Sequence, residues 1–354
     1  MNFIARIRNR PFFIRLFHWE YWSFNAIYGL IFPVWFWLCL RARSLFFFAA
    51  SNPSIRNGGF LNESKKDIAA IIPPAWHPAT AFFTVPSNTD MVKLVLEKQG
   101  LDYPLIGKPN VGGRGRGVKV IGDDAALERF VKAACLDFHI QEFVPYKMEA
   151  GIFYYRFPNE EKGAISGIVR KEFLKVQGDG RQTLGALALQ NMRATMYLPA
   201  LQKMNADAWD RILSEGEEYI LSPYGNHARG AMFLDDSHLA DEQLREVMDQ
   251  VCRQIPGFYF GRLDIRFKSW EDLKAGRHFS IIEVNGAGSE PTHIYDPSHS
   301  LFFAWKEIIR HWVLLYKISR INHRLGHPYL SWKEGLAMFR ENRYWSERLA
   351  AMPD

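Results

Sequence analysis

Cysteine is scarce in this sequence, with only three residues among 354. Cys39, Cys135 and Cys252 are far apart and form no Cys-x-x-Cys pair, which argues against a disulfide framework or a structural zinc site and favours a reducing compartment. Internal repeats and low-complexity linkers are also missing. Hydrophobic residues make up 48% of the chain and charged residues 23%, so a disordered chain is excluded. At roughly 100–200 residues per domain, the length predicts two domains.

Acidic residues are few at both ends of the chain. Residues 1–43 hold six arginines against Glu20, and residues 301–349 hold nine lysines and arginines against four glutamates. Because the net charge is only +6, the middle of the chain is acidic. A uniformly basic nucleic-acid-binding domain is therefore disfavoured, and we predict no nucleic-acid partner.

No formal charge occurs between residues 21 and 40, whose sequence is YWSFNAIYGLIFPVWFWLCL. This length would suffice to span a bilayer, but no small-residue cleavage site follows, which argues against a signal peptide. Three alternatives remain: an interfacial or re-entrant segment, a segment packed on the protein, and a spanning helix. The aromatic content, Pro33 at the middle and arginines on both flanks favour the interfacial alternative. We therefore expect a cytoplasmic protein that lies peripherally on an anionic membrane surface.

From residue 44 onward, the hydrophobic pattern predicts an α/β protein. The continuous apolar runs SLFFFAA and TAFFTV are expected to be strands, and helices are expected in the segments KKDIAAII, DMVKLVLEKQ, DDAALERFVKAAC and DEQLREVMDQVCRQI. The tail from Leu301 is also expected to be helical. Its basic residues fall on one polar stripe, which is either a solvated face or a surface for a membrane or acidic partner: Lys306, Arg310, Lys317, Arg320 and Arg324.

The segment PLIGKPNVGGRGRGVKVI contains a glycine-rich loop, in which four of the six residues 112–117 are glycine. An expected strand ends at Lys108, and the backbone N–H groups of such a loop can wrap an anion, with Lys108, Arg114 and Arg116 supplying positive charge. No Gly-Lys-Ser/Thr closes the loop, and a strand follows it, so it is neither a Walker A loop nor a dinucleotide fingerprint. The alternative is an ordinary glycine-rich hairpin turn.

A second polar group lies on the strand-like runs GRLDIRF and HFSIIEVN. Glu283 and Asn285 are two residues apart and therefore share one face of a strand. If the two runs pair as a hairpin, Asp264 joins them, and Arg262 shares the face of Asp264. Two carboxylates and an amide oxygen form a hard-oxygen site suited to Mg²⁺ bridging phosphates.

In this order the motifs resemble the ATP-grasp superfamily, in particular the D-alanine–D-alanine ligases and glutathione-synthetase-like carboxylate–amine ligases, over roughly residues 85–300. The resemblance implies an α/β (α+β) ATP-grasp fold that uses ATP and Mg²⁺, with two metal ions and Mn²⁺ as the alternative metal. It implies nucleotide binding by Lys108, by the loop residues Gly113, Arg114, Gly115, Arg116 and Gly117, by the hinge residues Glu142, Phe143 and Val144, and by Glu149, Lys171 and Asn226.

The same resemblance implies the remaining roles at the site. Asp264, Glu283 and Asn285 match the metal ligands, and Arg262, Arg229 and Lys171 match catalytic positions, with Lys175 as a substitute for Lys171. The stretches Gly178–Leu184 and Tyr224–Gly230 are similar to segments of the glutathione-synthetase-like members. His227, Glu290 and His293 are the candidates for binding or deprotonating the acceptor, although a lone histidine is more often structural.

The sequence departs from the family after Asn285, where Gly286-Ala287-Gly288-Ser289 replaces Thr/Ser-x-Pro-Gly. That loop faces the acceptor in the family, so D-alanine is disfavoured as the substrate. We expect a basic, aromatic segment over residues 1–43, a reduced α/β region over 44–90, the ATP-grasp domain over 91–300, with two subdomains and a hinge near 142–149, and a basic helical extension over 301–354.

The resemblance implies transfer of the γ-phosphoryl group of ATP to a carboxylate, which gives an acylphosphate that an amine attacks. Lys108 and Lys171 would offset phosphate charge, and Arg262 would stabilise the tetrahedral oxyanion. The expected partners are small-molecule or lipid-linked carboxylates and amines. A carboxylate–thiol ligase, a phosphoryl-transferring relative and a non-catalytic nucleotide-binding membrane scaffold are the alternatives.

Overall fold

A computed structural model describes residues 11–113 and 115–350. The chain divides into two compact units that each combine distant segments of the sequence. Unit 1 consists of residues 1–33, 169–235 and 292–307, and unit 2 of residues 34–168, 236–291 and 308–354.

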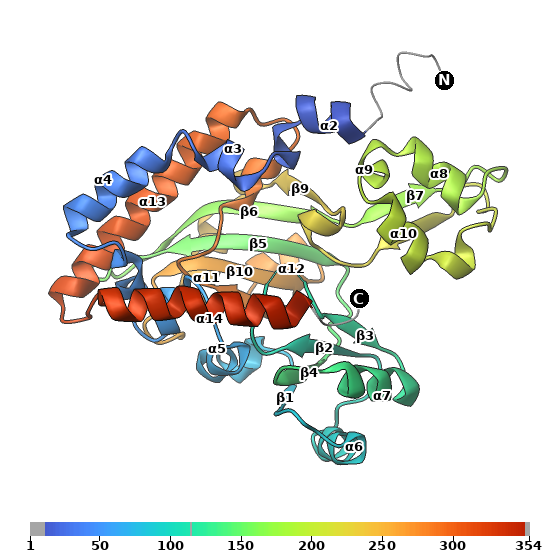
Figure 1. Ribbon diagram of the computed structural model, residues 1–354, viewed down its shortest axis with the longest axis horizontal. Coiled ribbons are helices and arrows are strands. Elements are labelled where there is room, and N and C mark those ends of the chain that lie inside the picture. The colour runs from blue at the N-terminus through green and yellow to red at the C-terminus, as the bar shows by residue number, and fades with distance from the viewer. Residues whose placement is uncertain (1–10, 114, 351–354) are drawn as a thin grey trace. The chain divides into compact units, whose positions relative to one another are not determined.

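The first sheet of unit 2 is antiparallel, with the strand order β1-β4-β2-β3. Its strands are β1 (Thr80–Phe83), β2 (Leu105–Pro109), β3 (Lys119–Ile121) and β4 (Phe138–Glu142). Helices α6 (Thr89–Lys98) and α7 (Asp124–Ala133) bury one face of this sheet through an apolar cluster that includes Leu127, Phe138 and Ile140 (Figure 1). The other face carries Lys108, His139 and Gln141, because side chains alternate along a strand.

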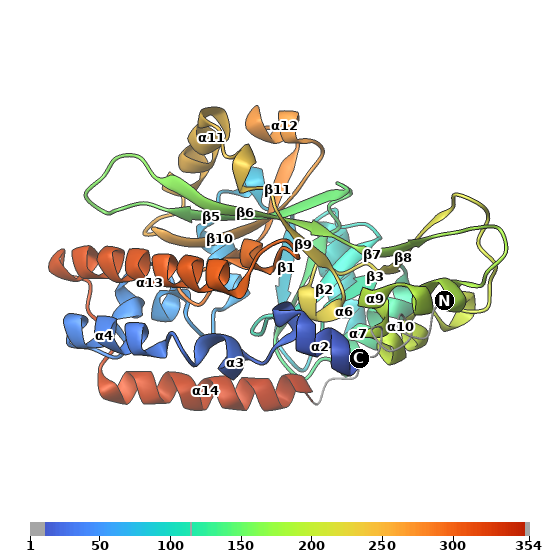
Figure 2. The same cartoon turned by 90° about the horizontal axis from the view of Figure 1, so that it is seen from above.

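The second sheet of unit 2 has the order β11-β10-β5-β6 and is formed by β5 (Met148–Tyr155), β6 (Ala164–Glu172), β10 (Phe260–Phe267) and β11 (Phe279–Asn285). Helices α5 (Lys65–Ile71), α11 (Glu242–Arg253) and α12 (Trp270–Lys274) contribute to the apolar cluster on one face. Helices α4 (Phe32–Ala42), α13 (Leu301–Arg324) and α14 (Trp332–Ala350) contribute to the cluster on the other. Figure 2 shows α11 and α12 on one side of the strands and α4, α13 and α14 on the opposite side.

Unit 1 contains the end of β6, which pairs with β9 (Met232–Asp235), and the two-stranded ribbon of β7 (Leu174–Gln177) and β8 (Glu218–Ser222). Its own apolar cluster includes Leu184, Leu201, Leu213 and Leu221. Its helices are α2 (Pro11–Phe17), α3 (Phe24–Tyr28), α8 (Leu184–Gln190), α9 (Met192–Thr195), α10 (Leu198–Met204) and the first residues of α13.

The predicted α/β class is confirmed, and most expected elements form. Helix α5 begins where the side chain of Ser64 accepts a hydrogen bond from the Asp67 N–H, and α6 begins at the corresponding Asn88 cap. The strand expected at SLFFFAA is wrong, because Phe47–Ala50 form a buried 3₁₀ turn. A short apolar run fits a buried turn as well as a buried strand, and periodicity does not separate the two.

The charge-free run of residues 21–40 forms two short helices, and Pro33 lies in the first turn of α4. Among the described residues, no helix is both long and apolar enough to cross a membrane. One face of α4 is packed, since Leu38 and Cys39 are buried, whereas Phe36 and Leu40 are exposed. The run therefore combines a packed face with an exposed apolar face.

The basic stripe expected along α13 is only partly exposed. Lys317 and Arg324 are exposed, but Arg310 donates to the Ser166 carbonyl oxygen at 2.5 Å and Arg320 donates to the Tyr316 hydroxyl at 2.9 Å. The same helix buries Asn322, which bonds two backbone carbonyls of the segment before α5. The predicted polar stripe is therefore present in part: Lys306 is exposed as well, while Arg310 and Arg320 are half-buried.

Candidate active site

The expected hairpin is formed by β10 and β11, which pair in antiparallel fashion. Their register places Asp264 opposite Glu283 and Arg262 opposite Asn285. The Arg262 Nε and Nη2 atoms lie 2.7 and 3.2 Å from the two Asp264 carboxylate oxygens, and Nη1 donates to the Glu290 carbonyl at 3.2 Å. The local alternation of the two strands therefore brings four predicted site residues into one polar group.

The donor set of this group fits a hard divalent cation. Glu283 and Asn285 both line a cavity. The buried Nδ2 atom of Asn285 has no hydrogen-bond partner among the described residues, and as an N–H donor it suits a phosphate oxygen and not the cation itself. No three His, Cys, Asp or Glu side chains in residues 11–113 and 115–350 are grouped to hold a metal by themselves. A Mg²⁺ ion here would therefore combine oxygens of Asp264, Glu283 and Asn285 with phosphate oxygens, as Mg²⁺ usually does.

Lys108 reaches this group from β2. Its Nζ atom donates to the Gln141 Oε1 at 2.7 Å and to the Ile282 carbonyl at 3.4 Å, one residue before Glu283. Gln141 is oriented by its own hydrogen bond to the Thr80 hydroxyl at 3.0 Å. Burial lowers the pKa of Lys108 to about 8, although the nearby Glu283 carboxylate opposes the shift. A half-buried cation therefore lies beside the strand that carries the acidic group.

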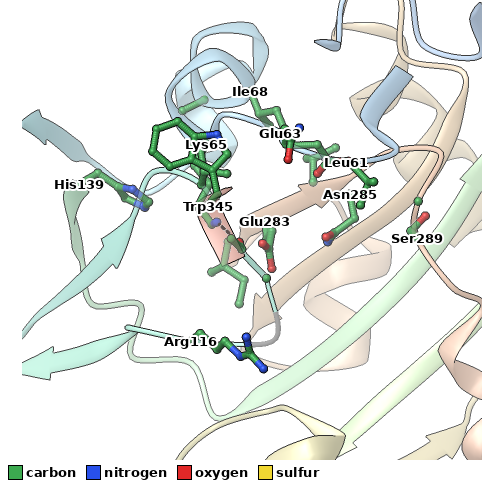
Figure 3. A pocket seen from close by; sticks show the side chains of 18 of the residues that line it. Leu61, Glu63, Lys65, Ile68, Arg116, His139, Glu283, Asn285, Ser289 and Trp345 are labelled. Atoms are coloured by element: carbon green, nitrogen blue, oxygen red, sulfur yellow. Dashed lines mark hydrogen bonds between the residues drawn. The ribbon is translucent and has the colours of Figure 1, made fainter. Parts of the chain in front are cut away.

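A cavity of about 470 Å³ in unit 2 opens next to Glu283 and Asn285 (Figure 3). Two residues of its wall that sequence reasoning missed are Glu63 and Lys65. The Glu63 Oε1 accepts the Gly286 N–H at 3.1 Å, and burial raises the pKa of Glu63 to about 8. Lys65 donates from Nζ to the Gly112 carbonyl at 2.5 Å, at the start of the glycine loop. Both lie more than 170 residues before the acidic strand, so no local pattern could place them.

Helix α14 forms another part of the cavity wall, with Asn342, Trp345, Ser346 and Leu349. The helix is held at its middle and near its C-terminal end. Arg56 makes two hydrogen bonds, of 3.0 and 2.8 Å, to the Glu341 carboxylate, and Arg348 donates to the Cys135 carbonyl at 2.9 Å. The C-terminal extension is therefore part of the candidate site, a role that its basic composition did not indicate.

The glycine loop is described except for Arg114, which lies outside the described residues. Gly112, Gly115 and Gly117 all have positive φ, at 123°, 68° and 67°, which explains why glycine occupies these positions. Gly113 and Arg116 line the cavity. The loop therefore has the backbone freedom that phosphate wrapping requires, and Arg116 supplies a cation at the cavity.

The predicted hinge is held by Arg266, which sequence reasoning missed. Its Nε atom lies 3.2 Å from the Glu149 carboxylate, its Nη1 atom donates to the Val144 carbonyl at 3.2 Å, and its guanidinium lies 5.7 Å from the centre of the Phe143 ring. Glu142 is exposed. The alternation of side chains along β10 could have identified Arg266 from the sequence, because it lies on the same face of the strand as Arg262 and Asp264.

The loop that departs from the family pattern packs backbone against backbone. The Ala287 N–H donates to the Gly58 carbonyl at 2.9 Å, and the Gly288 N–H donates to the Gly59 carbonyl at 2.7 Å. A Cβ atom on Gly286 would lie 2.6 Å from the Gly58 oxygen and 2.7 Å from the Gly59 Cα. Glycine is therefore required by close approach, and the segment before α5 fixes the position of this loop.

Gly286→Ala should lower the free energy of unfolding by about 1–3 kcal/mol, because the added methyl group overlaps backbone atoms that cannot move independently. Gly122→Ala is the matched control, since nothing lies within 4 Å of its Cβ position. Urea unfolding followed by circular dichroism measures both. Equal stability of the two variants would contradict the close packing of this loop.

The remaining predicted site residues belong to unit 1: Lys171, Asn226, His227, Arg229 and His293. Lys171 is buried in β6, opposite Phe233 of β9, whereas the substitute Lys175 is exposed and pairs with Glu218 at 2.6 Å. The Arg229 guanidinium lies 4.3 Å from the centre of the Tyr224 ring. The burial of the first lysine and the exposure of the second favour Lys171 as the candidate.

His227 belongs to a buried ionic cluster of unit 1, here called the Glu20 cluster and consisting of Glu20, Arg193 and His227. The Glu20 carboxylate lies 2.7 Å from Arg193 Nη2 and 2.9 Å from His227 Nε2. Burial alone would raise the pKa of Glu20, but the hydrogen bond from His227 and the charge of Arg193 outweigh it and lower the pKa. Sequence reasoning missed this contact, which joins residues 207 positions apart.

His293 and the stretch Gly178–Leu184, which the sequence also singled out, form hydrogen bonds with other residues of unit 1. His293 is buried, with Nε2 at 3.3 Å from the Glu307 carboxylate. In the stretch Gly178–Leu184, Asp179 accepts hydrogen bonds from Gln182 and from the Arg181 N–H, which lower its pKa to about 2. Thr183 then caps α8. This stretch therefore forms a turn followed by the start of a helix.

Comparison with solved structures returns ligases of the kind predicted from the sequence. The chain is similar to a bifunctional glutathione synthetase from Pasteurella multocida (13% identity, 70% of this chain and 35% of that one, TM-score 0.41). It is similar to the D-alanine–D-alanine ligase from Bacillus anthracis complexed with ATP (13%, 80% and 69%, TM-score 0.39) and to the ATP-grasp ligase PsnB (11%, 70% and 59%, TM-score 0.37). The chain thus spans about a third of the first relative's length. No family model and no curated protein matches the sequence.

Proposed function

We propose that the protein is an ATP-dependent ligase that activates a carboxylate as an acylphosphate for attack by an amine. The register of β10 with β11 carries this proposal, because it groups Asp264, Glu283, Arg262 and Asn285. Lys108 lies beside the same strand. Carboxylates next to half-buried cations, at the wall of a cavity, suit in-line phosphoryl transfer, since most of the catalysis comes from positioning and charge.

In this proposal, Asp264, Glu283 and Asn285 would hold Mg²⁺, which would neutralise charge on the phosphates of ATP. Lys108 binds a phosphate oxygen through Nζ, and the glycine loop covers the phosphates with its N–H groups. A carboxylate oxygen of the substrate attacks the γ-phosphorus and ADP leaves. The amine then attacks the acyl carbon, Arg262 stabilises the tetrahedral oxyanion, and phosphate departs.

Segment 60–72 and helix α14 lie outside the part of the chain that resembles the ATP-grasp ligases. Their side chains support the proposal that the carboxylate substrate occupies the cavity. Segment 60–72 supplies Lys65, a cation for a carboxylate, and apolar side chains such as Ile68. Helix α14 supplies the aromatic Trp345 and the polar Asn342. This lining suits a carboxylate with an apolar body, whether a small molecule or the end of a lipid-linked substrate.

Hydroxylamine trapping tests the proposal without knowledge of the amine. The protein is incubated with Mg-ATP, hydroxylamine and each member of a panel of carboxylates, and hydroxamate is measured together with released phosphate. A true substrate should give equal amounts of both, because hydroxylamine attacks the acylphosphate and displaces phosphate.

ADP formation with a stable phosphorylated product and no hydroxamate would instead assign phosphoryl transfer without an acyl intermediate. Product formed only with thiols, and not with amines, would assign a carboxylate–thiol ligase. Absence of ATP binding in calorimetry would reject the nucleotide site itself.

A further inference from the structure

Helix α4 of unit 2 presents an apolar face to solvent. Phe36, Trp37 and Leu40 are 60%, 55% and 68% exposed, while Leu38 and Cys39 on the opposite face are buried. Three large apolar side chains grouped on one helical face are unusual for a surface that meets only water. This face therefore indicates an apolar partner.

Helix α14 presents a second such face. The spacing of residues 332, 336, 339 and 343 places Trp332, Leu336, Phe339 and Arg343 on one stripe. The three apolar side chains are 62%, 43% and 47% exposed. The cavity-lining residues of α14, such as Trp345, follow a different face of the helix. The exposed stripe is therefore distinct from the candidate active site.

The chain segment after α4 packs against the exposed stripe of α14 and against the buried face of α4. The Phe46 ring lies 6.0 Å from Trp332 and 6.3 Å from Phe339, measured between ring centres, and Phe46 shares an apolar cluster with Leu38 of α4. Leu45, beside it, is 44% exposed. Figure 2 shows both helices on the same side of the strands of unit 2. We call the exposed faces of α4 and α14, with Leu45, the α4–α14 surface.

Positive charge is concentrated among these apolar side chains. Six basic residues of α4, the following turn and α14 are exposed, against two exposed acidic residues of α14: Arg41, Arg43, Lys333, Arg340, Arg343 and Arg348 against Glu334 and Glu347. The Arg41 guanidinium lies 6.0 Å from the centre of the Trp37 ring. Arginines can direct their charge to lipid headgroups while their stems and the neighbouring aromatic rings lie at the interface.

We propose that the α4–α14 surface binds an anionic lipid bilayer without crossing it. Tryptophan and arginine together match the headgroup region, and each basic residue near an anionic leaflet adds about 1 kcal/mol of attraction. The preceding segment of unit 1 has the same character, with Phe12, Phe17 and Leu30 exposed. This inference goes beyond the proposed activity and does not depend on it. It assigns the basic membrane surface to α14, whereas the sequence offered the stripe of α13 as one of two alternatives.

Vesicle flotation with the full-length protein tests the surface. Phosphatidylcholine vesicles with and without phosphatidylserine are compared for the natural protein, a triple variant Phe36→Ser/Trp37→Ser/Leu40→Ser and a charge-reversal variant Arg340→Glu/Arg343→Glu. Met91→Ser/Leu94→Ser is the matched control, because both side chains are exposed on α6, at 60% and 42%. Melting temperature and size-exclusion chromatography with light scattering are recorded for every variant.

The natural protein and the α6 control should float with the phosphatidylserine vesicles. The triple variant should bind at least ~tenfold more weakly, since it removes most of the apolar area that α4 would bury in the bilayer. Charge reversal should weaken binding to the phosphatidylserine vesicles most, and added salt should do the same. Natural protein that stays at the bottom of the gradient would overturn the proposal. A triple variant that floats like the natural protein, or one that only converts a dimer into a monomer, would also overturn it.

Discussion

Glu283→Gln is expected to lower turnover by at least ~100-fold, because it removes one charged metal ligand from a site whose charge stabilisation is worth several kcal/mol. Glu283 projects from β11 into the cavity, and its partner on β10 is Asp264. Glutamine preserves the size of the side chain, so the fold should survive. The measurement is hydroxamate formation at saturating ATP, repeated over a range of Mg²⁺ concentrations.

Glu97→Gln is the matched control, because it makes the same chemical change at an exposed position of α6. Asp264→Asn is a weaker test than Glu283→Gln. It leaves the buried Arg262 guanidinium beside a neutral amide, and breaking one partner of a buried ion pair typically costs about 3–5 kcal/mol of stability. A Glu283→Gln protein with near-natural turnover would contradict the metal site.

Lys108→Ala should weaken ATP binding by about 10–100-fold, which corresponds to the 1.5–3 kcal/mol of a hydrogen bond to a charged group. Isothermal titration calorimetry with Mg-ATP measures the effect. Lys98→Ala, at an exposed position of α6, is the control. Unchanged affinity in Lys108→Ala would remove the glycine loop and its lysine from the nucleotide site, whatever the protein's activity.

The burial of Lys108 also predicts a pH dependence. Its pKa in the free protein is about 8, below the usual value for lysine, so the side chain loses its charge as the pH rises through about 8. ATP affinity should therefore fall between pH 7 and pH 9 in the natural protein. Lys108→Arg keeps a cation over this range, and its affinity should change less. Identical pH profiles would contradict a charged role for Lys108.

The β10–β11 hairpin could be predicted because a strand has a period of two. Glu283 and Asn285 share a face by spacing alone, and the pairing with Asp264 needed only a short connection between the two strands. The N-terminal caps at Ser64 and Asn88 were likewise local signals. Features that depend only on residues within about ten positions of each other could therefore be predicted from the sequence.

Glu63, Lys65 and Trp345 could not be predicted as cavity residues, because each reaches the cavity through packing between distant segments. Glu63 meets Gly286 across 223 positions, and no spacing rule spans that distance. The partial burial of the α13 stripe has a similar origin. Helical periodicity placed Arg310 on a polar stripe, but the hydrogen bond to Ser166 depends on which element packs against that face.

The Glu20 cluster has a practical consequence for anyone who wishes to shorten the chain. Cutting away the aromatic N-terminal residues to improve handling would delete the carboxylate that faces Arg193 and His227, two side chains of a different segment of unit 1. Glu20 and Arg193 have side chains only 7% and 10% exposed, and an uncompensated charge at such a position costs on the order of 3–5 kcal/mol. A truncated protein that failed to bind vesicles or turn over ATP would therefore report damage to unit 1, so the N-terminus is better dissected by substitution than by deletion.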